Sequence, residues 1–320
     1  MHPPAGFPEP SPHPQEAPLT PSLPNPSRAA LAACTLALAA AAAPAHAQRG
    51  FDWNGEVASG ATLRVYTTSG TVTVREASGR TARIHAELEN AAEGEIRFVS
   101  DRSGGGVRVC ALREGATCND NGVQGGNSNG WRQWRNRRGK ANFTVEVPRG
   151  VVVRVSSGNG DVAVSGATAD VHAASGNGDV RVGAGAATVG ASSGNGTVMV
   201  DGARGPVHAS SGNGRVTVST AAGPVNASTG NGRVEVAIAS RASGDMEFSS
   251  GNGSITVTLP SDFGAQVEAS TGNGGFQSDF PLQVNGRISS HRVSGTIGRG
   301  GGRLRLSTGN GSITLRRAGS

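Results

Sequence analysis

Residues 157–164 read SGNGDVAV, and close copies of this octapeptide recur almost to the end of the chain. The copies are marked by the tetrapeptide Ser/Thr-Gly-Asn-Gly. The first five are spaced by 18 residues, the next two by 21 and the last by 37. A repeat of this length is typical of solenoid proteins, in which each unit packs only on its neighbours. The tetrapeptides begin at Ser157, Ser175, Ser193, Ser211, Thr229, Ser250, Thr271 and Thr308.

Apolar residues alternate with polar ones on both sides of each tetrapeptide. A period of two predicts strands, so each unit holds one short strand before the turn and one after it. One unit has too little apolar surface to be stable alone, whereas stacked units bury a continuous narrow core. The sequence therefore predicts an all-β, single-stranded parallel β-helix, or β-solenoid, with coils of about 18 residues. The clearest apolar columns are Val162, Val180, Val198, Val216 and Val234 after the turn, and Val171, Val189, Val207 and Val225 before it.

The Gly-Asn-Gly segment suits a tight turn between the two strands, because Gly adopts positive φ freely and Asn tolerates it. In register, the Asn side chains of successive coils would stack, each amide bonding to the next. We therefore expect a structural turn ladder and not a ligand site. It comprises Asn159, Asn177, Asn195, Asn213, Asn231, Asn252, Asn273 and Asn310.

The first 47 residues are expected to lie outside the fold. A Pro-rich leader precedes Arg28, an apolar run over residues 29–43 and an Ala-x-Ala pattern ending at Ala47. This order predicts a secretory signal peptide, and the run is shorter than the roughly 20 residues of a membrane span. The protein is thus expected to be exported to the periplasm, the outer cell surface or the medium. Lipidation at Cys34 is a minority alternative.

Residues 48–150 are expected to form a less regular β cap that precedes the repeats of residues 151–320. A degenerate turn, Ser69-Gly70-Thr71, lies within this cap, and a Gly/Asn/Arg-rich loop over residues 113–140 interrupts it. Export permits a disulfide between Cys110 and Cys118. At the other end, residues 304–315 are expected to supply the last rung, with the charges of Arg316 and Arg317 at its edge discouraging strand addition.

The chain resembles a bacterial domain family of unknown function whose members are described as candidate adhesins and form β-helices. The resemblance rests on the repeats, on Val145–Gly150 entering them, and on two closing stretches. These read LPSDFGAQVEASTGNGGFQSDFPL from Leu259 and SGTIGRGGGRLRLSTGNGSITL from Ser294. It covers roughly residues 55–318 and implies an envelope β-helix with no assigned catalytic residue. The segment 113–140 departs from the family pattern.

The formal net charge of +6 invites a nucleic-acid partner, but most Arg residues are scattered singly between apolar positions, so none is expected. The one basic cluster with aromatic residues lies in the inserted loop. It is either a solvated loop, which we favour, or a contact for an anionic polymer, with Arg on phosphate and Trp stacking. The residues are Trp131, Arg132, Trp134, Arg135, Arg137, Arg138 and Lys140.

No catalytic, cofactor or metal site is expected. His172 and His208 share one outward column but lie two rungs apart, too far to hold one metal. Two carboxylate pairs are candidates for adjacent rungs, Asp161 with Asp179 and Glu247 with Glu268. Neither has further acidic residues nearby, and no nucleophile–base constellation is present.

Export and a regular fold favour a non-catalytic envelope or extracellular protein, acting as an adhesin or a structural scaffold. The expected partner is an envelope polysaccharide, lipopolysaccharide or another surface protein. Two alternatives stay open. One is a carbohydrate-active enzyme or polysaccharide-binding protein on a β-helix, and the other is a filament built by end-to-end stacking.

Overall fold

In the computed structural model, the described residues are 50–103, 105–125, 139–220, 223–238, 244–284, 289 and 291–319. They belong to one compact unit, His46–Ser320. The leader, the expected signal peptide and Cys34 lie outside the described residues. Within the described ranges, no helix is long and apolar enough to cross a membrane.

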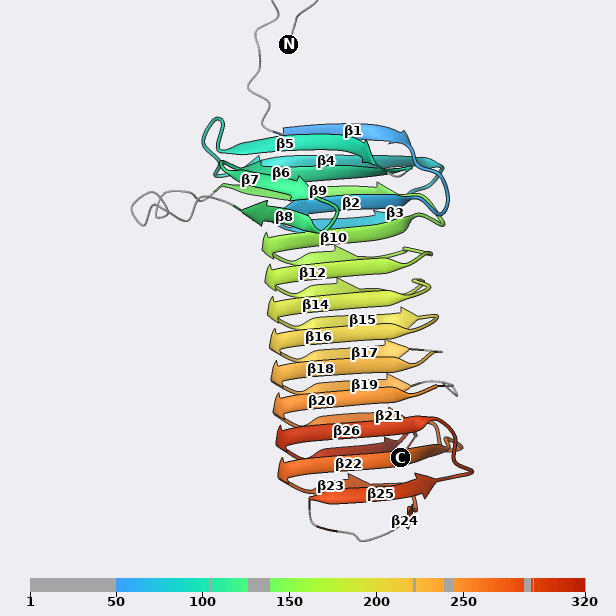
Figure 1. Cartoon of the computed structure of the whole chain (residues 1–320). Helices are drawn as coiled ribbons and strands as arrows, with labels where there is room; N and C mark the ends of the chain where they lie inside the picture. Colours follow the sequence, from blue (N-terminus) through green and yellow to red (C-terminus); the bar gives the residue numbers. More distant parts are fainter. Residues whose placement is uncertain are drawn as a thin grey trace, which may run out of the picture. The chain divides into compact units, whose positions relative to one another are not determined.

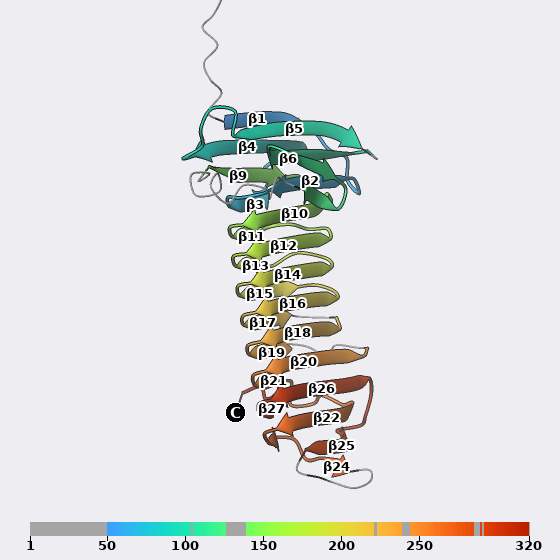
Figure 2. The same ribbon diagram turned by 60° about the vertical axis from the view of Figure 1, so that its left-hand side comes forward.

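Six regular coils form the middle of the β-solenoid, and each contains a longer strand, the Gly-Asn-Gly turn and a shorter strand (Figures 1 and 2). The longer strands stack in a 13-stranded sheet, here sheet B, and the shorter ones in a 12-stranded sheet, sheet A. The fold class predicted from the repeats is confirmed. The coils are β10 (Val152–Asn159) with β11 (Val162–Val164), β12 (Val171–Asn177) with β13 (Val180–Val182), β14 (Val189–Asn195) with β15 (Val198–Ala203), β16 (Val207–Asn213) with β17 (Val216–Thr220), β18 (Val225–Asn231) with β19 (Val234–Ile238), and β20 (Met246–Asn252) with β21 (Ile255–Leu259).

The coils pair in parallel and in register, so like residues meet in the interior. Val171 lies between Val153 and Val189, and all three are fully buried. The inward Ser or Thr that opens each turn donates to a glycine carbonyl of a neighbouring coil, as Ser175 does to Gly160 at 2.8 Å. Each buried hydroxyl is therefore satisfied, which explains why a polar residue occupies a core column.

The turns stack as closely as the strands do. A Cβ at Gly178, whose φ is 151°, would collide with the carbonyl oxygen of Gly160 in the preceding coil. Only glycine permits this approach, which gives each Gly-Asn-Gly turn a packing reason beyond its conformational freedom.

At the N-terminal end, two coils within the expected cap region, residues 48–150, belong to the stack itself. β2 (Thr62–Thr67) and β3 (Val72–Glu76), joined through the degenerate Ser69-Gly70-Thr71 turn, pack on β10 and β11. β6 (Gly106–Arg113) and β9 (Lys140–Val147) form the next coil outward, and the insertion stands where its turn would be. Antiparallel strands then cover this end: β1 (Gly50–Glu56), β4 (Thr81–Glu89) and β5 (Ile96–Ser103).

At the C-terminal end, the prediction that residues 304–315 form the last rung is wrong. β26 (Arg303–Asn310) and β27 (Ile313–Arg317) lie between the coil of β20 and β21 and the coil of β22 (Ala265–Asn273) and β23 (Phe276–Ser278). β25 (Arg292–Ile297) and β24 (Gln283–Val284) then add antiparallel to β22.

The apolar content of the two coils accounts for this order. The coil of β26 and β27, here the inserted coil, has four fully buried large side chains: Leu304, Leu306, Ile313 and Leu315. The outer coil offers only a half-buried Phe276 and Ser278 on its second strand. Placing the more apolar coil inside removes more apolar surface from water.

The position of β26 and β27 between two other coils also corrects two local predictions. Arg316 pairs with Thr258 of β21 inside the stack, so its charge does not lie at the terminal edge, where it would discourage strand addition. Arg305 lies between Glu247 and Glu268, which are thus two rungs apart, and its Nη2 is 3.3 Å from Oε2 of Glu268.

Candidate functional site: a groove on the outer face of sheet B

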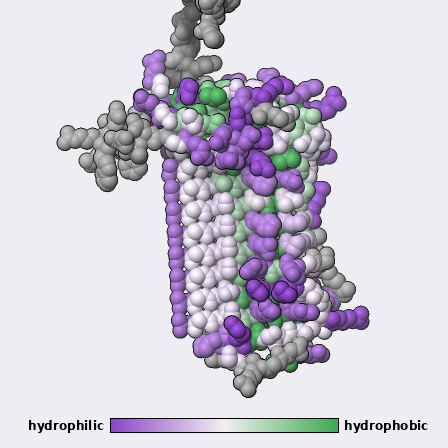
Figure 3. All heavy atoms as spheres, in the orientation of Figure 1, coloured by the Kyte–Doolittle hydropathy of each residue, from purple (hydrophilic) through white to green (hydrophobic). Residues whose placement is uncertain are grey.

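The outer face of sheet B carries two columns of side chains that are set by the in-register pairing. One column reads Arg108, Arg64, Arg154, His172, Gly190, His208, Asn226 and Glu247 from β6 to β20. The other, two residues further along each strand, is mostly small: Ser156, Ala174, Ser192, Ser210, Ser228 and Ser249. In Figure 3 this face shows a pale strip of weakly polar residues along the stack.

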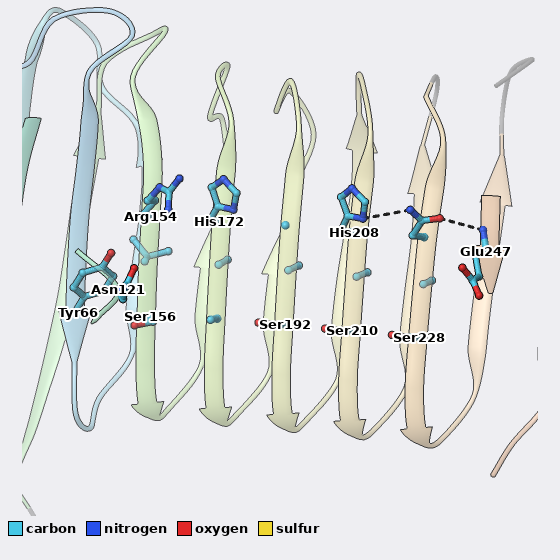
Figure 4. Close-up of a pocket in the computed structure, with 18 of the residues that line it drawn as sticks. Tyr66, Asn121, Arg154, Ser156, His172, Ser192, His208, Ser210, Ser228 and Glu247 are labelled. Carbon is cyan, nitrogen blue, oxygen red and sulfur yellow. Dashed lines mark hydrogen bonds between the residues drawn. The ribbon is translucent and has the colours of Figure 1, made fainter. Parts of the chain in front are cut away.

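The small residues leave a shallow groove of about 730 Å³. Its lining comes from seven successive strands, from Tyr66 on β2 to Glu247 and Ser249 on β20. Figure 4 shows the labelled Arg154, His172, His208 and Glu247 on separate strands, with the serines in a row beside them. The groove therefore runs across the strands, along the direction of stacking.

A hairpin from the inserted segment closes the groove at its N-terminal end. β7 (Ala116–Asn119) and β8 (Gly122–Gly125) pack over Tyr66, Cys110 and Leu112 in a small second core. The Cys110–Cys118 disulfide, which the sequence had anticipated, is present and ties the hairpin to β6. Among the described residues, the hairpin thus covers the outer face of sheet B at β2 and β6 and leaves it open from β10 onward.

Polar contacts fix the tip of this hairpin. The Tyr66 hydroxyl donates to the carbonyl oxygen of Asp120 at 2.9 Å, and burial raises the pKa of Tyr66. Arg108 donates to the carboxylates of Asp101 at 2.6 Å and Asp120 at 2.8 Å. Asp120 and its neighbour Asn121 consequently line the closed end of the groove.

Arg154 supplies positive charge next to the hairpin, and His172 lies on the neighbouring strand. Arg154 is exposed, and its guanidinium has no ion pair or hydrogen bond with any part of the chain that the structure describes. Burial lowers the pKa of His172, and the charge of Arg154 lowers it further. His172 is therefore mostly neutral near pH 7 and gains its charge on acidification.

His208 is oriented by a short hydrogen-bonded chain. The Asn226 Oδ1 accepts the Glu247 backbone N–H at 3.1 Å, so the Asn226 Nδ2 faces His208 Nδ1, 3.4 Å away. The dashed lines in Figure 4 mark both contacts. Because Nδ1 accepts, the neutral ring carries its proton on Nε2, which leaves an N–H donor for a ligand.

Gly190 separates the two histidines and forms a notch. A Cβ at this position would lie 3.0 Å from Nδ1 of His172, so the His172 imidazole lies directly beside the glycine. His172 and His208 do not meet, and in the described ranges no group of three or more His, Cys, Asp or Glu residues is placed to hold a metal ion.

The asparagine ladder lies apart from the groove. From Asn177 onward, each Nδ2 donates to the Oδ1 of the preceding rung at 2.7 or 2.8 Å. The coil of β26 and β27 takes part, since Asn273 bonds to Asn310 and Asn310 to Asn252. Asp161 and Asp179 do lie on adjacent rungs, but their carboxylates accept backbone N–H groups of the next coil at 2.8 Å. Both sets thus hold coils together.

The basic and aromatic cluster of the insertion cannot be placed against the groove. Trp131, Arg132, Trp134, Arg135, Arg137 and Arg138 lie outside the described residues. Lys140 begins β9 on sheet A, and its Nζ is 3.8 Å from Glu89 Oε1. Sequence reasoning missed the groove itself, although its signal was present in the run of small outward residues that flanks the two histidines.

The fold and the hollowed face define a β-solenoid repeat protein with an open, polar sheet surface. The chain belongs to the Toastrack family, a domain of unknown function (DUF4097), whose model matches residues 60–316. No protein among those with curated functions matches it.

Solved structures with similar chains include a candidate cell adhesion protein from Clostridium sporogenes, 11% identical, covering 84% of this chain and 99% of its own with a TM-score of 0.29. A candidate adhesin from Bacteroides fragilis is 11% identical, covers 84% and 97%, and has a TM-score of 0.43. A candidate lipid-binding protein from Parabacteroides distasonis is 11% identical, covers 85% and 96%, and has a TM-score of 0.35.

Proposed function

We propose that this chain is an exported, non-catalytic protein of the cell envelope or extracellular space that acts as an adhesin or structural scaffold. It holds an extended partner along the outer face of sheet B. The observation that carries the proposal is the groove, which crosses seven successive strands and has a serine on five of them. A rigid, repetitive surface of this kind is suited to a repetitive partner, and solenoids commonly bind along such faces.

The arrangement of the lining supports binding over catalysis. Arg154, His172, His208 and Glu247 each lie on a different strand, and strands are about 4.8 Å apart. His208 is engaged by Asn226, and no hydrogen bond links either histidine to a serine within the described residues. A nucleophile with its base in reach would be needed for acyl or glycosyl transfer.

The enzyme alternative has one clear test, which uses Asp179. Its carboxylate accepts the Thr197 backbone N–H and pairs with Arg181 at 2.7 Å, so the proposal gives it a structural role. The purified protein is expected to release no new reducing ends from acidic polysaccharides. Release that Asp179→Ala abolishes, while the coils remain folded, would contradict the proposal.

The filament alternative is disfavoured by the covered end of sheet B. β25 and β24 add antiparallel beyond β22, so among the described strands sheet B presents no parallel edge at this end to another copy, and the three-residue β23 is the edge strand of sheet A. Sedimentation of the purified protein tests this, and we expect no concentration-dependent fibres.

Location and role are tested together in the bacterium that makes the protein. Cell fractionation with N-terminal sequencing is expected to find the chain in the envelope or the medium, starting at Gln48. Deletion of its coding sequence should reduce attachment or envelope integrity, and the wild-type protein should restore it. An uncleaved chain confined to the cytoplasm, with a deletion strain that attaches normally, would overturn the proposal.

A further inference from the structure

We propose that the groove on sheet B binds a single extended strand of an acidic polysaccharide, with its carboxylates near Arg154, His172 and His208. The inference deepens the proposed function and rests on it, because it names the chemical class of partner for the same face. It follows from the shape of the groove, from the distribution of charge along it, and from the donors that the lining presents.

The shape fits one chain lying lengthwise. Seven strands about 4.8 Å apart span about 29 Å, so a volume of about 730 Å³ corresponds to a mean cross-section of about 25 Å². That section admits one linear polymer and excludes a globular ligand. Because the groove crosses the strands at right angles, its occupant is not a peptide added as a further strand to a sheet edge.

The lining offers hydroxyl and amide groups at a regular spacing. Ser192, Ser210 and Ser228 place one hydroxyl on each of three neighbouring strands, with Asn226 beside them. The rise of about 4.8 Å per strand is close to the length of one sugar unit in an extended glycan, so successive sugars meet equivalent groups. These side chains donate and accept hydrogen bonds, as sugar hydroxyls require.

Charge makes an acidic glycan the better fit. Arg154 has an unpaired guanidinium within the described residues, His172 lies on the neighbouring strand, and His208 lies two strands further along. Glu247, which is exposed, places negative charge at the opposite end. The Asp120 carboxylate at the closed end is already paired with Arg108, so a carboxylate gains most in the half of the groove around Arg154, here its cationic half.

Single-stranded nucleic acid is the less suitable anion. Stacking on aromatic rings provides much of its binding energy, and the one phenolic ring in the lining, Tyr66, is only 4% exposed. The Tyr66 hydroxyl is also engaged by Asp120, so the ring is held under the hairpin.

Gly190 makes the cationic half accessible. Its missing side chain leaves the notch between the two imidazoles, and the His172 ring lies beside this notch, because a Cβ on Gly190 would be 3.0 Å from Nδ1 of His172. A carboxylate bound here would face His172 and His208, with Arg154 one strand beyond. Substitution by Val would fill the notch without altering charge.

Binding is expected to strengthen on acidification. The charged groups around His172 are Arg154 on β10 and Asp170 before β12, while β14 contributes the uncharged Gly190 and β16 contributes His208. A bound carboxylate favours the imidazolium, so protonation and binding promote each other. Uronate carboxyls, with pKa values of about 3 to 4, stay ionised at pH 5.

The test is isothermal titration of the purified protein with hexagalacturonate and with its fully methyl-esterified form at pH about 5 and about 7.5. We expect the acid form to bind about tenfold more tightly at the lower pH, and the ester to bind weakly at both. Arg154→Gln and Gly190→Val should each weaken binding about tenfold. Arg215→Gln is the control. It removes an exposed charge just before β17, outside the groove, and should leave binding unchanged.

Equal binding of the acid and the ester, or equal effects of Arg154→Gln and Arg215→Gln, would overturn the inference. If neutral glycans bind and Gly190→Val abolishes that binding, the proposed function stands and the acidic class is wrong. Absence of binding to the acid form at both pH values also overturns the inference, whereas the proposed function is decided by the fractionation and deletion experiments.

Discussion

Nδ2 of Asn310 donates to Oδ1 of Asn252 at 2.7 Å, although the two residues are 58 positions apart. Asn273, which follows Asn252 by 21 residues in the sequence, bonds to Asn310 instead. The last repeat of the chain therefore occupies the place between two repeats that are consecutive in sequence. Every structural feature that depends on the order of the coils, including the separation of Glu247 from Glu268, follows from this insertion.

Engineered cysteines can test the order of the coils. Ser249 and Ser307 are paired neighbours on the outer face, whereas Ser249 and Ser270 are separated by the inserted strand. In a Cys34→Ser background, we expect the Ser249→Cys/Ser307→Cys pair to form a disulfide, because parallel neighbours lie within disulfide reach. The Ser249→Cys/Ser270→Cys pair should stay reduced. The reverse result, read by thiol counting and mass spectrometry, would show a sequential stack.

The inserted coil should also be a main source of stability at its end. Leu306 is fully buried between Phe248 and Ala269. We expect Leu306→Ala to cost about 2–5 kcal/mol of unfolding free energy, measured by urea denaturation. Val284→Ala, on the exposed edge strand β24, is the control and should change stability by less than about 0.5 kcal/mol. Similar small effects of both changes would contradict the interior position of the coil.

The asparagine ladder predicts a difference between inner and terminal rungs. Asn213 donates to Asn195 and accepts from Asn231, while Asn159 accepts from Asn177 but donates only to the Thr68 carbonyl oxygen, at 3.4 Å. Asn213→Ala should therefore lower the unfolding free energy by about 1–2 kcal/mol, and more than Asn159→Ala does. Chemical denaturation of the two variants provides the comparison, and equal losses would mean that the ladder contributes little.

Two histidines are expected to respond to acid in opposite ways. A hydrogen bond to Asp52 raises the pKa of His85, so its stabilising contribution is present at low pH and fades as the pH rises through that value. Burial lowers the pKa of His172, so protonation opposes folding as the pH falls below about 6.5. NMR titration should place the His85 midpoint above that of His172. The His85→Gln and His172→Gln variants should shift the pH dependence of stability in opposite directions.

The disulfide should act locally. Cys118→Ser frees the hairpin of β7 and β8 from β6, which removes the cross-link from Cys110 but leaves the coils intact. Hydrogen exchange is expected to rise over residues 116–125 and to stay unchanged over residues 152–182. A general loss of protection would show that the hairpin supports the whole stack.

The regular part of this fold was predictable from sequence because one period repeats with the same side chains. Val162, Val180 and Val198 specify both the strand and its inward face, and Asn177 specifies the turn. The order of the last coils was not predictable in the same way. Thr271 and Thr308 open equivalent turns, so the local pattern fits either position, and only the larger apolar content around Leu306 selects the interior.

The candidate site was predictable only in part. The sequence placed His172 and His208 two rungs apart on one column, which the pairing with Gly190 confirms. It did not foresee the groove, because a hollow depends on which residues are small on several coils at once and on a hairpin folding back from residues 116–125. The tip at Asp120 reaches Tyr66 across 54 positions, a contact without a local sequence signal.

The central claim, that the partner is held on the outer face of sheet B, is tested most directly with two bulky substitutions in one coil. Ser210→Trp on β16 fills the groove, while Thr217→Trp on β17 places the same side chain on the outer face of sheet A. Retention on isolated cell envelopes should be lost for Ser210→Trp and kept for Thr217→Trp. Equal retention of the two variants, with both folded, would contradict the account.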